Sequence, residues 1–139
     1  MPIDIKLLHD GIGVLYDCNG TLTGQDLIDA NKKILAFGEE IKHLRYGLID
    51  ESAINDLNIS ESEMTTIAMQ DEKIASLVPD GAIVAVIAKS AFAFGLSRLW
   101  ESFIEHTGWE TMTFRDRLMA ESWIRAKVKA NFGIDLTFG

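Results

Sequence analysis

The chain has few of the residues that mark secreted, membrane-spanning and disulfide-rich proteins. It contains one cysteine and two prolines among 139 residues, so Cys18 has no partner for a disulfide within the chain. No apolar run approaches the roughly 20 residues that a membrane-spanning helix needs. The first residues, MPIDIKLLHDG, lack a basic segment followed by an apolar one. These absences predict a cytoplasmic protein that meets membranes only peripherally, if at all.

Basic residues are also scarce. Lys and Arg number 13 against 21 Asp and Glu, which gives a formal net charge of −8. Because nucleic-acid binding depends on basic side chains that neutralise phosphates, we expect no nucleic-acid partner. The composition, 47% hydrophobic and 24% charged, is that of an ordinary globular protein. The length fits a single domain over residues 1–139.

The pattern of turns and apolar residues predicts an α/β fold. Asp10-Gly11 lies between IDIKLL and IGVLYDC, as in a tight β-hairpin, and Asn19-Gly20 is expected to end the second strand. Four helices are then expected to alternate with strands, the helices at 22–41, 60–78, 90–108 and 116–133 and the strands at 43–50, 82–88 and 109–114. The all-apolar run AIVAVIA suits a central strand that is covered on both faces. The sequence therefore predicts a mixed sheet with a hairpin start and parallel strands after it.

This order of elements resembles the STAS fold of anti-sigma-factor antagonists. NGTLTGQDL (19–27) resembles the step from the second strand into the first helix, and YGLIDES (46–52) resembles the strand that ends in an acidic residue. FGLSRLWESF (94–103) and TFRDRLMAESWI (113–124) are similar to the SpoIIAA-like branch of small bacterial proteins. The resemblance implies a STAS-like fold, a binding or regulatory role, and an apolar ligand site between helices and sheet.

The resemblance also raises an alternative function, because the antagonists carry a serine that their partner kinase phosphorylates. The matching segment here, NDLNISESEM, places Ser60 and Ser62 near the start of an expected helix but has no Ser-Ser-Gly. Ser60 and Glu63 fit a capping box, and a phosphate would meet the like charges of Glu61 and Glu63. The sequence favours Ser60 as a helix cap, and a phosphorylation-controlled partner switch is the alternative.

No residue pattern predicts catalysis, a metal or a cofactor. His9, His43 and His106 lie in different expected elements without the spacing of metal ligands, and no Gly-x-Ser-x-Gly elbow is present. Asp50 and Glu51 are adjacent at an expected strand end, where α/β sheets often place sites. A solvated loop is the favoured interpretation of that pair. We therefore expect a binding protein without enzymatic activity.

Aromatic and methionine side chains supply the candidates for a ligand site. In the helix expected at 90–108, a stripe at helical spacing is predicted to face the core. It comprises Phe92, Leu96, Leu99 and Phe103, and Trp100 and Ile104 widen it on one side. Phe94 projects to the charged side, so it is expected either to tuck under a neighbouring loop or to meet a ligand or partner. Methionines adapt to irregular apolar ligands. The residues predicted to line a site for a hydrophobic small molecule or lipid, or to contact a protein partner, are Met64, Met69, Phe92, Phe94, Trp100 and Met119.

The C-terminal segment predicts self-association. In GIDLTFG the apolar residues Ile134, Leu136 and Phe138 alternate, as in a strand that closes the sheet or crosses to another chain. Five basic residues gather between 115 and 129 in an otherwise acidic chain. A basic rim of this kind could meet the acidic 50–72 region of a second copy, and we expect a homodimer.

Overall fold

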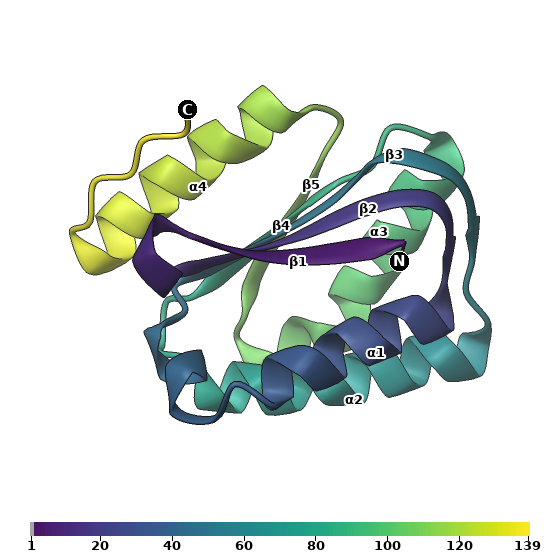
Figure 1. Ribbon diagram of the computed structural model, residues 1–139, viewed down its shortest axis with the longest axis horizontal. Coiled ribbons are helices and arrows are strands. Elements are labelled where there is room, and N and C mark those ends of the chain that lie inside the picture. Colours follow the sequence, from purple (N-terminus) through teal and green to yellow (C-terminus); the bar gives the residue numbers. More distant parts are fainter. Residues whose placement is uncertain (1) are drawn as a thin grey trace.

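The computed structural model describes residues 2–139 and shows one mixed sheet with helices on both faces (Figure 1). The strands lie in the order of the sequence: β1 (Ile3–Leu8), β2 (Gly13–Thr23), β3 (Tyr46–Asn58), β4 (Ile83–Ile87) and β5 (Glu110–Phe114). β1 is antiparallel to β2, and β2 to β5 run parallel. The predicted α/β fold is confirmed: a β-hairpin start is followed by helices that alternate with parallel strands.

Four main helices cover the sheet unequally. α1 (Gly24–Leu35), α2 (Glu61–Leu77) and α3 (Ala91–Ile104) lie on one face, and α4 (Arg117–Phe132) lies on the other (Figure 1). Short 3₁₀ turns follow β1, α1 and α3 and are η1 (His9–Gly11), η2 (Gly38–His43) and η3 (Glu105–Thr107). None of the helices between residues 2 and 139 combines the length and the apolar character needed to cross a bilayer.

The central strand β4 is buried along its whole length because helices cover both faces of the sheet. Val84 and Val86 face the core under α1, α2 and α3. The alternate residues Ile83, Ala85 and Ile87 face the core under α4. The sequence prediction for this apolar run is confirmed.

β2 and β3 are longer than the sequence predicts. Asn19-Gly20 does not end β2, which continues to Thr23 and pairs with the second half of β3 after two register shifts. Gly20 has a positive φ of 67°, a conformation that glycine adopts at little cost and that suits a bulge. The paired strand ends curl over the helical layer before the chain enters α1 and α2 (Figure 1). Asp50 and Glu51 therefore lie within a strand, and the predicted solvated loop is wrong.

Capping boxes begin both of the helices that follow these curled strands. The Thr23 hydroxyl accepts a hydrogen bond from the Asp26 amide (3.2 Å), and the Ser60 hydroxyl accepts one from the Glu63 amide (3.1 Å). The Glu63 carboxylate in turn accepts from the Ser60 amide (2.8 Å). Gly24 lets the two helix starts approach, because a Cβ there would lie 2.6 Å from the Glu63 side chain. Ser60 is thus confirmed as a helix cap.

The buried face of α3 is only partly the predicted one. Phe92, Leu99 and Phe103 are exposed, with 63%, 47% and 39% of their surface accessible. Trp100 and Ile104, which widen the predicted stripe, do face the core, together with Ala93 and Ser97, and Leu96 packs against it. Ala93 and Ser97 are small, which lets the helix lie close to the sheet, and the Ser97 hydroxyl hydrogen-bonds Thr113 of β5 (2.7 Å). With Ala93 and Ser97 against the sheet, Phe92, Leu99 and Phe103 are left on the exposed side, while Trp100 and Ile104 stay buried.

Phe94 and the C-terminal segment both pack within the chain. Phe94 is half-buried against the core under α3, with the Arg115 guanidinium 4.5 Å from its ring centre, so it tucks under the segment between β5 and α4. Residues 134–139 form no strand, and the predicted terminal strand is wrong. Leu136 is instead buried in the core under α4, and the Phe138 ring lies 4.9 Å from the His9 ring. The alternation of apolar residues there reflects packing on the core rather than strand pairing.

Candidate functional site

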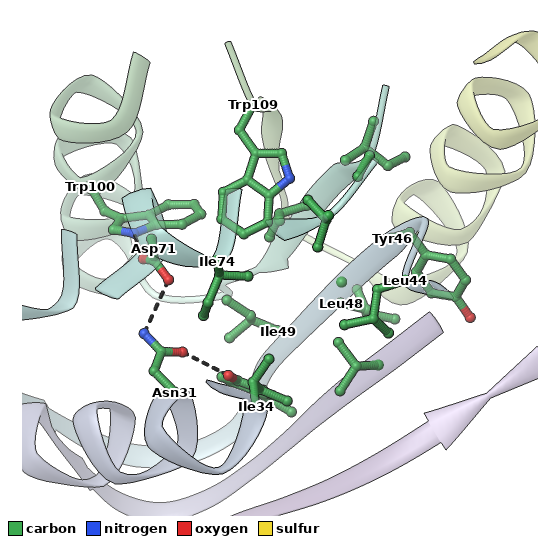
Figure 2. Close-up of a pocket in the computed structure, with 17 residues that line it drawn as sticks. Asn31, Ile34, Leu44, Tyr46, Leu48, Ile49, Asp71, Ile74, Trp100 and Trp109 are labelled. Carbon is green, nitrogen blue, oxygen red and sulfur yellow. Dashed lines mark hydrogen bonds between the residues drawn. The ribbon is translucent and has the colours of Figure 1, made fainter. Parts of the chain in front are cut away.

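A chain of buried hydrogen bonds joins β2 to the three helices on its face. Tyr16 Oη donates to Asn31 Oδ1 on α1 (2.7 Å), and Asn31 Nδ2 donates to Asp71 Oδ1 on α2 (3.1 Å). Trp100 Nε1 on α3 donates to Asp71 Oδ2 (2.6 Å; Figure 2). We call these four residues the polar bridge. Because its donors converge on Asp71, both carboxyl oxygens have a hydrogen-bond partner.

The polar bridge holds an acid that changes charge near neutral pH. Burial raises the pKa of Asp71 to about 7, and the hydrogen bonds from Trp100 and Asn31 offset only part of the rise. The pKa of Tyr16 is also raised, first by burial and second by the charge of Asp71. The Tyr16 hydroxyl is therefore a hydrogen-bond donor throughout the physiological pH range.

Two cavities lie back to back on either side of the polar bridge, between the sheet and the three helices. Each has a volume of about 50 Å³, and both are lined by Tyr16, Asn31, Ile49, Asp71 and Trp100. Figure 2 shows the first, at the end of the sheet where β2, β3 and β4 begin. We name it the Trp109 cavity because the indole of Trp109 lines it (Figure 2).

The Trp109 cavity is apolar except for two groups. The polar bridge forms one wall, and the rest of the lining is largely aliphatic, including Ile34, Leu44 and Ile74. The indole nitrogen of Trp109 is buried and has no hydrogen-bond partner among residues 2–139. An unpaired buried donor costs free energy, so this N–H is suited to bind an acceptor on a ligand or a water molecule.

The second cavity, which we name the Glu51 cavity, lies toward the curled ends of β2 and β3. Its apolar lining comes from all of the surrounding elements and includes Leu27, Ile49, Leu57, Ile59, Met64, Ile67, Val86, Ala93 and Leu96. Its polar lining, besides the bridge, is Glu51 and Ser97. Ile59 and Leu96 are only half-buried, which places this end of the cavity near the surface.

Glu51 is a buried acid on the face of β3 that α1, α2 and α3 cover. Burial raises the pKa of its carboxyl to about 7, and the neighbouring charge of Asp50 adds to the rise. Asp50 points to the opposite face, where Arg117 of α4 donates to its carboxylate (2.9 Å). Burial would raise the pKa of Asp50 too, but hydrogen bonds from Ser52 and Arg117 outweigh it and hold that pKa below its usual value. Two adjacent acids thus have opposite environments because strand residues alternate in direction.

The thiol of Cys18 is not activated as a nucleophile. Cys18 is fully buried, and burial, followed by the charges of Glu51 and Asp50, raises its pKa. A thiol with a raised pKa stays protonated at neutral pH and is a poor nucleophile. Cys18 is accordingly a core residue of β2.

The six residues predicted to line a ligand site divide into three groups. Met64 and Trp100 line the Glu51 cavity. Phe94 is half-buried and lines neither of the two cavities. The other three are exposed and are Met69, Phe92 and Met119. Phosphorylation at Ser60 or Ser62 stays a prediction, although the Ser60 hydroxyl already serves the cap of α2.

The polar residues of the site were missed, although the sequence holds a signal for two of them. Asn31 lies between Leu27 and Ile34 at helical spacing, and Asp71 lies four residues after Ile67. A polar residue on the apolar face of a helix must find a partner when it is buried. Two such residues on neighbouring helices could have predicted the bridge.

No protein-family model matches the chain, and no curated protein matches it either.

Proposed function

We propose that this protein is a non-catalytic binding protein whose ligand is a small organic molecule with an apolar body and a polar end. The observation that carries the proposal is the pair of apolar cavities that meet at the polar bridge. Ligand sites in proteins are mostly apolar concavities with a few polar groups that fix orientation. Here those groups are the bridge, the unpaired Trp109 indole N–H and the Glu51 carboxyl.

The size of the cavities limits the ligand. A volume of about 50 Å³ is well below the roughly 150 Å³ of an engineered cavity that takes benzene. The cavities as they stand suit short, unbranched chains. A lipid with long acyl chains would have to part α1 and α2 from the sheet, so a short amphipathic molecule is the ligand that the packing favours.

The STAS-like, SpoIIAA-like assignment belongs with this proposal. The hairpin start and the mixed five-stranded sheet are consistent with a STAS fold. The resemblance implies an apolar ligand site between helices and sheet, and both cavities lie there. This agreement in position supports a binding role.

Self-association stays a prediction. Several basic side chains that were expected to form a rim for a second copy are engaged within the chain. Arg117 contacts Asp50 and Glu121, and Lys127 contacts Glu110 (2.6 Å). Lys129 contacts Asp135. These pairs neutralise part of the basic segment, so a homodimer would rely on other surfaces as well.

Native mass spectrometry of the protein purified from its own cells tests the proposal. We expect a small bound mass, that of a short amphipathic molecule, that leaves on denaturation. Ala93 lines the Glu51 cavity, so Ala93→Leu should fill that space and reduce the bound fraction at least severalfold. Leu99→Ala on the exposed side of the same helix is the matched control and should keep the adduct. A chain free of any adduct in every preparation would contradict the proposal.

A further inference from the structure

The carboxyl of Glu51 has no hydrogen-bond or ion-pair partner among the residues that the structure describes. It is buried, with 9% of its surface accessible, and it lines the cavity that carries its name. Across residues 2–139 no hydrogen-bond donor or cation contacts its side chain, whereas both oxygens of Asp71 are bonded. Among the described residues, the fully enclosed side-chain atoms without a hydrogen-bond partner are Gln70 Oε1 and Trp109 Nε1, so the Glu51 oxygens keep some access to solvent. A ligand in the cavity can therefore reach this carboxyl and supply a partner for it.

The charges around the Glu51 cavity select the sign of that ligand. Its lining contains two acids, Glu51 and Asp71, and no Lys, Arg or His among the described residues. The neighbouring Arg117 is directed to the other face of the sheet, where it binds Asp50 and Glu121. An anionic head group would meet only like charge here, whereas a cationic one would find an unpaired carboxylate.

We propose that the Glu51 cavity binds a small primary amine, with its ammonium group against the Glu51 carboxylate and its apolar chain among Leu57, Ile59 and Met64. This inference rests on the proposed binding function and names the ligand class for one of its two cavities. An ammonium group is compact and has three N–H donors. Ser97 and Asp71 line the same cavity and provide further oxygen acceptors.

A primary ammonium fits this cavity better than a guanidinium does. A guanidinium is planar and gains most from a carboxylate that it can approach with two parallel N–H groups. The Glu51 cavity has a volume of about 50 Å³, which leaves little room for such a group beside an apolar chain. The ligand class is therefore a short alkylamine rather than an arginine-like molecule.

Isothermal titration calorimetry with three four-carbon ligands tests the inference: n-butylamine, 1-butanol and butyrate. At pH 8 the alkylamine is cationic, and the Glu51 carboxyl, whose pKa is about 7, is ionised. Because hydrogen bonds between charged groups are stronger than neutral ones, we expect butylamine to bind about tenfold or more tightly than butanol. Butyrate should bind more weakly than butanol.

Glu51→Gln keeps the shape of the side chain and removes its charge. We expect this variant to lose the preference for butylamine while its affinity for butanol stays within about twofold. Glu61→Gln removes an exposed acid at the start of α2 and should leave the preference unchanged. A melting curve checks that each variant is folded, and the three-ligand comparison on the unaltered protein decides the question even if Glu51→Gln does not fold.

The outcomes separate the two proposals. Butylamine binding no more tightly than butanol, or an undiminished preference in folded Glu51→Gln, would overturn the amine inference and leave the binding function standing. The absence of binding by all three ligands would overturn the binding function itself.

Discussion

Asp71 and Glu51 each place a carboxyl group where water is largely excluded. Asp71 is held by two neutral donors, and Glu51 by none among the described residues. Both pKa values are raised to about 7, in each case mainly by burial. A folded protein that keeps two acids protonated up to neutral pH must show this in the pH dependence of its stability.

The free energy of unfolding should fall as pH rises from about 4 to about 7. In this window the two acids are protonated in the folded chain but ionised in the unfolded chain, whose carboxyl pKa values are about 4. The unfolded state then binds fewer protons, so each group lowers stability by about 1.4 kcal/mol per pH unit. The free energy of unfolding stops falling above pH 7, because the two acids are then ionised in both the folded and the unfolded chain.

Asp71→Asn should remove about half of the decrease in the free energy of unfolding per pH unit. The double variant with Glu51→Gln should remove the rest of that decrease. Urea unfolding at pH 5, 6 and 7 measures the difference between the variants and the unaltered protein, which cancels the contribution of the histidines. A slope that is identical in all of these proteins would show that neither acid holds a proton in the fold.

At the scale of elements, α3 shows why apolar size alone does not orient a helix. Phe92, Leu99 and Phe103 of α3 are exposed. Two small residues, Ala93 and Ser97, face the core together with Trp100 and Ile104. Ser97 is bonded to Thr113 and Trp100 to Asp71, so polar contacts fix the side that faces inward. The sequence pattern does not contain these contacts because their partners lie on other elements.

A matched pair of substitutions on α3 tests this orientation. Ile104 is fully buried and Leu99 is 47% exposed. Ile104→Ala should lower the free energy of unfolding by about 2–5 kcal/mol through lost burial and a new cavity, whereas Leu99→Ala should cost less than about 1 kcal/mol. Urea unfolding curves measure both values. Equal losses, or a larger loss for Leu99→Ala, would contradict the observed helix orientation.

The sequence predicts the elements better than it predicts the site. The hairpin at Asp10-Gly11, the cap at Ser60 and the buried strand 82–88 follow from local patterns, and the structure confirms them. The cavities depend on how β2, β3 and three helices pack against one another. Local sequence patterns do not predict this packing. Glu51 was expected in a loop because β3 extends beyond the apolar run that predicted it.

At the scale of the whole molecule, one face of the sheet is packed differently from the other. α4 lies directly on one face, and its core is formed mainly by aliphatic residues and Tyr46. Three helices share the other face, and the polar bridge ties each of them to β2. The apolar side chains on either side of this bridge leave the two cavities. We therefore expect ligand binding on the three-helix face alone.

The three tryptophans make this claim directly measurable. Trp100 and Trp109 line the cavities, whereas Trp123 packs on the α4 face beside Phe114. The measurement is a nitrogen–proton NMR titration of the indole N–H signals with 1-butanol and n-butylamine. We expect saturable shifts of the Trp100 and Trp109 signals and a stationary Trp123 signal. Three stationary signals, or a shift of Trp123 alone, would contradict ligand binding on the three-helix face.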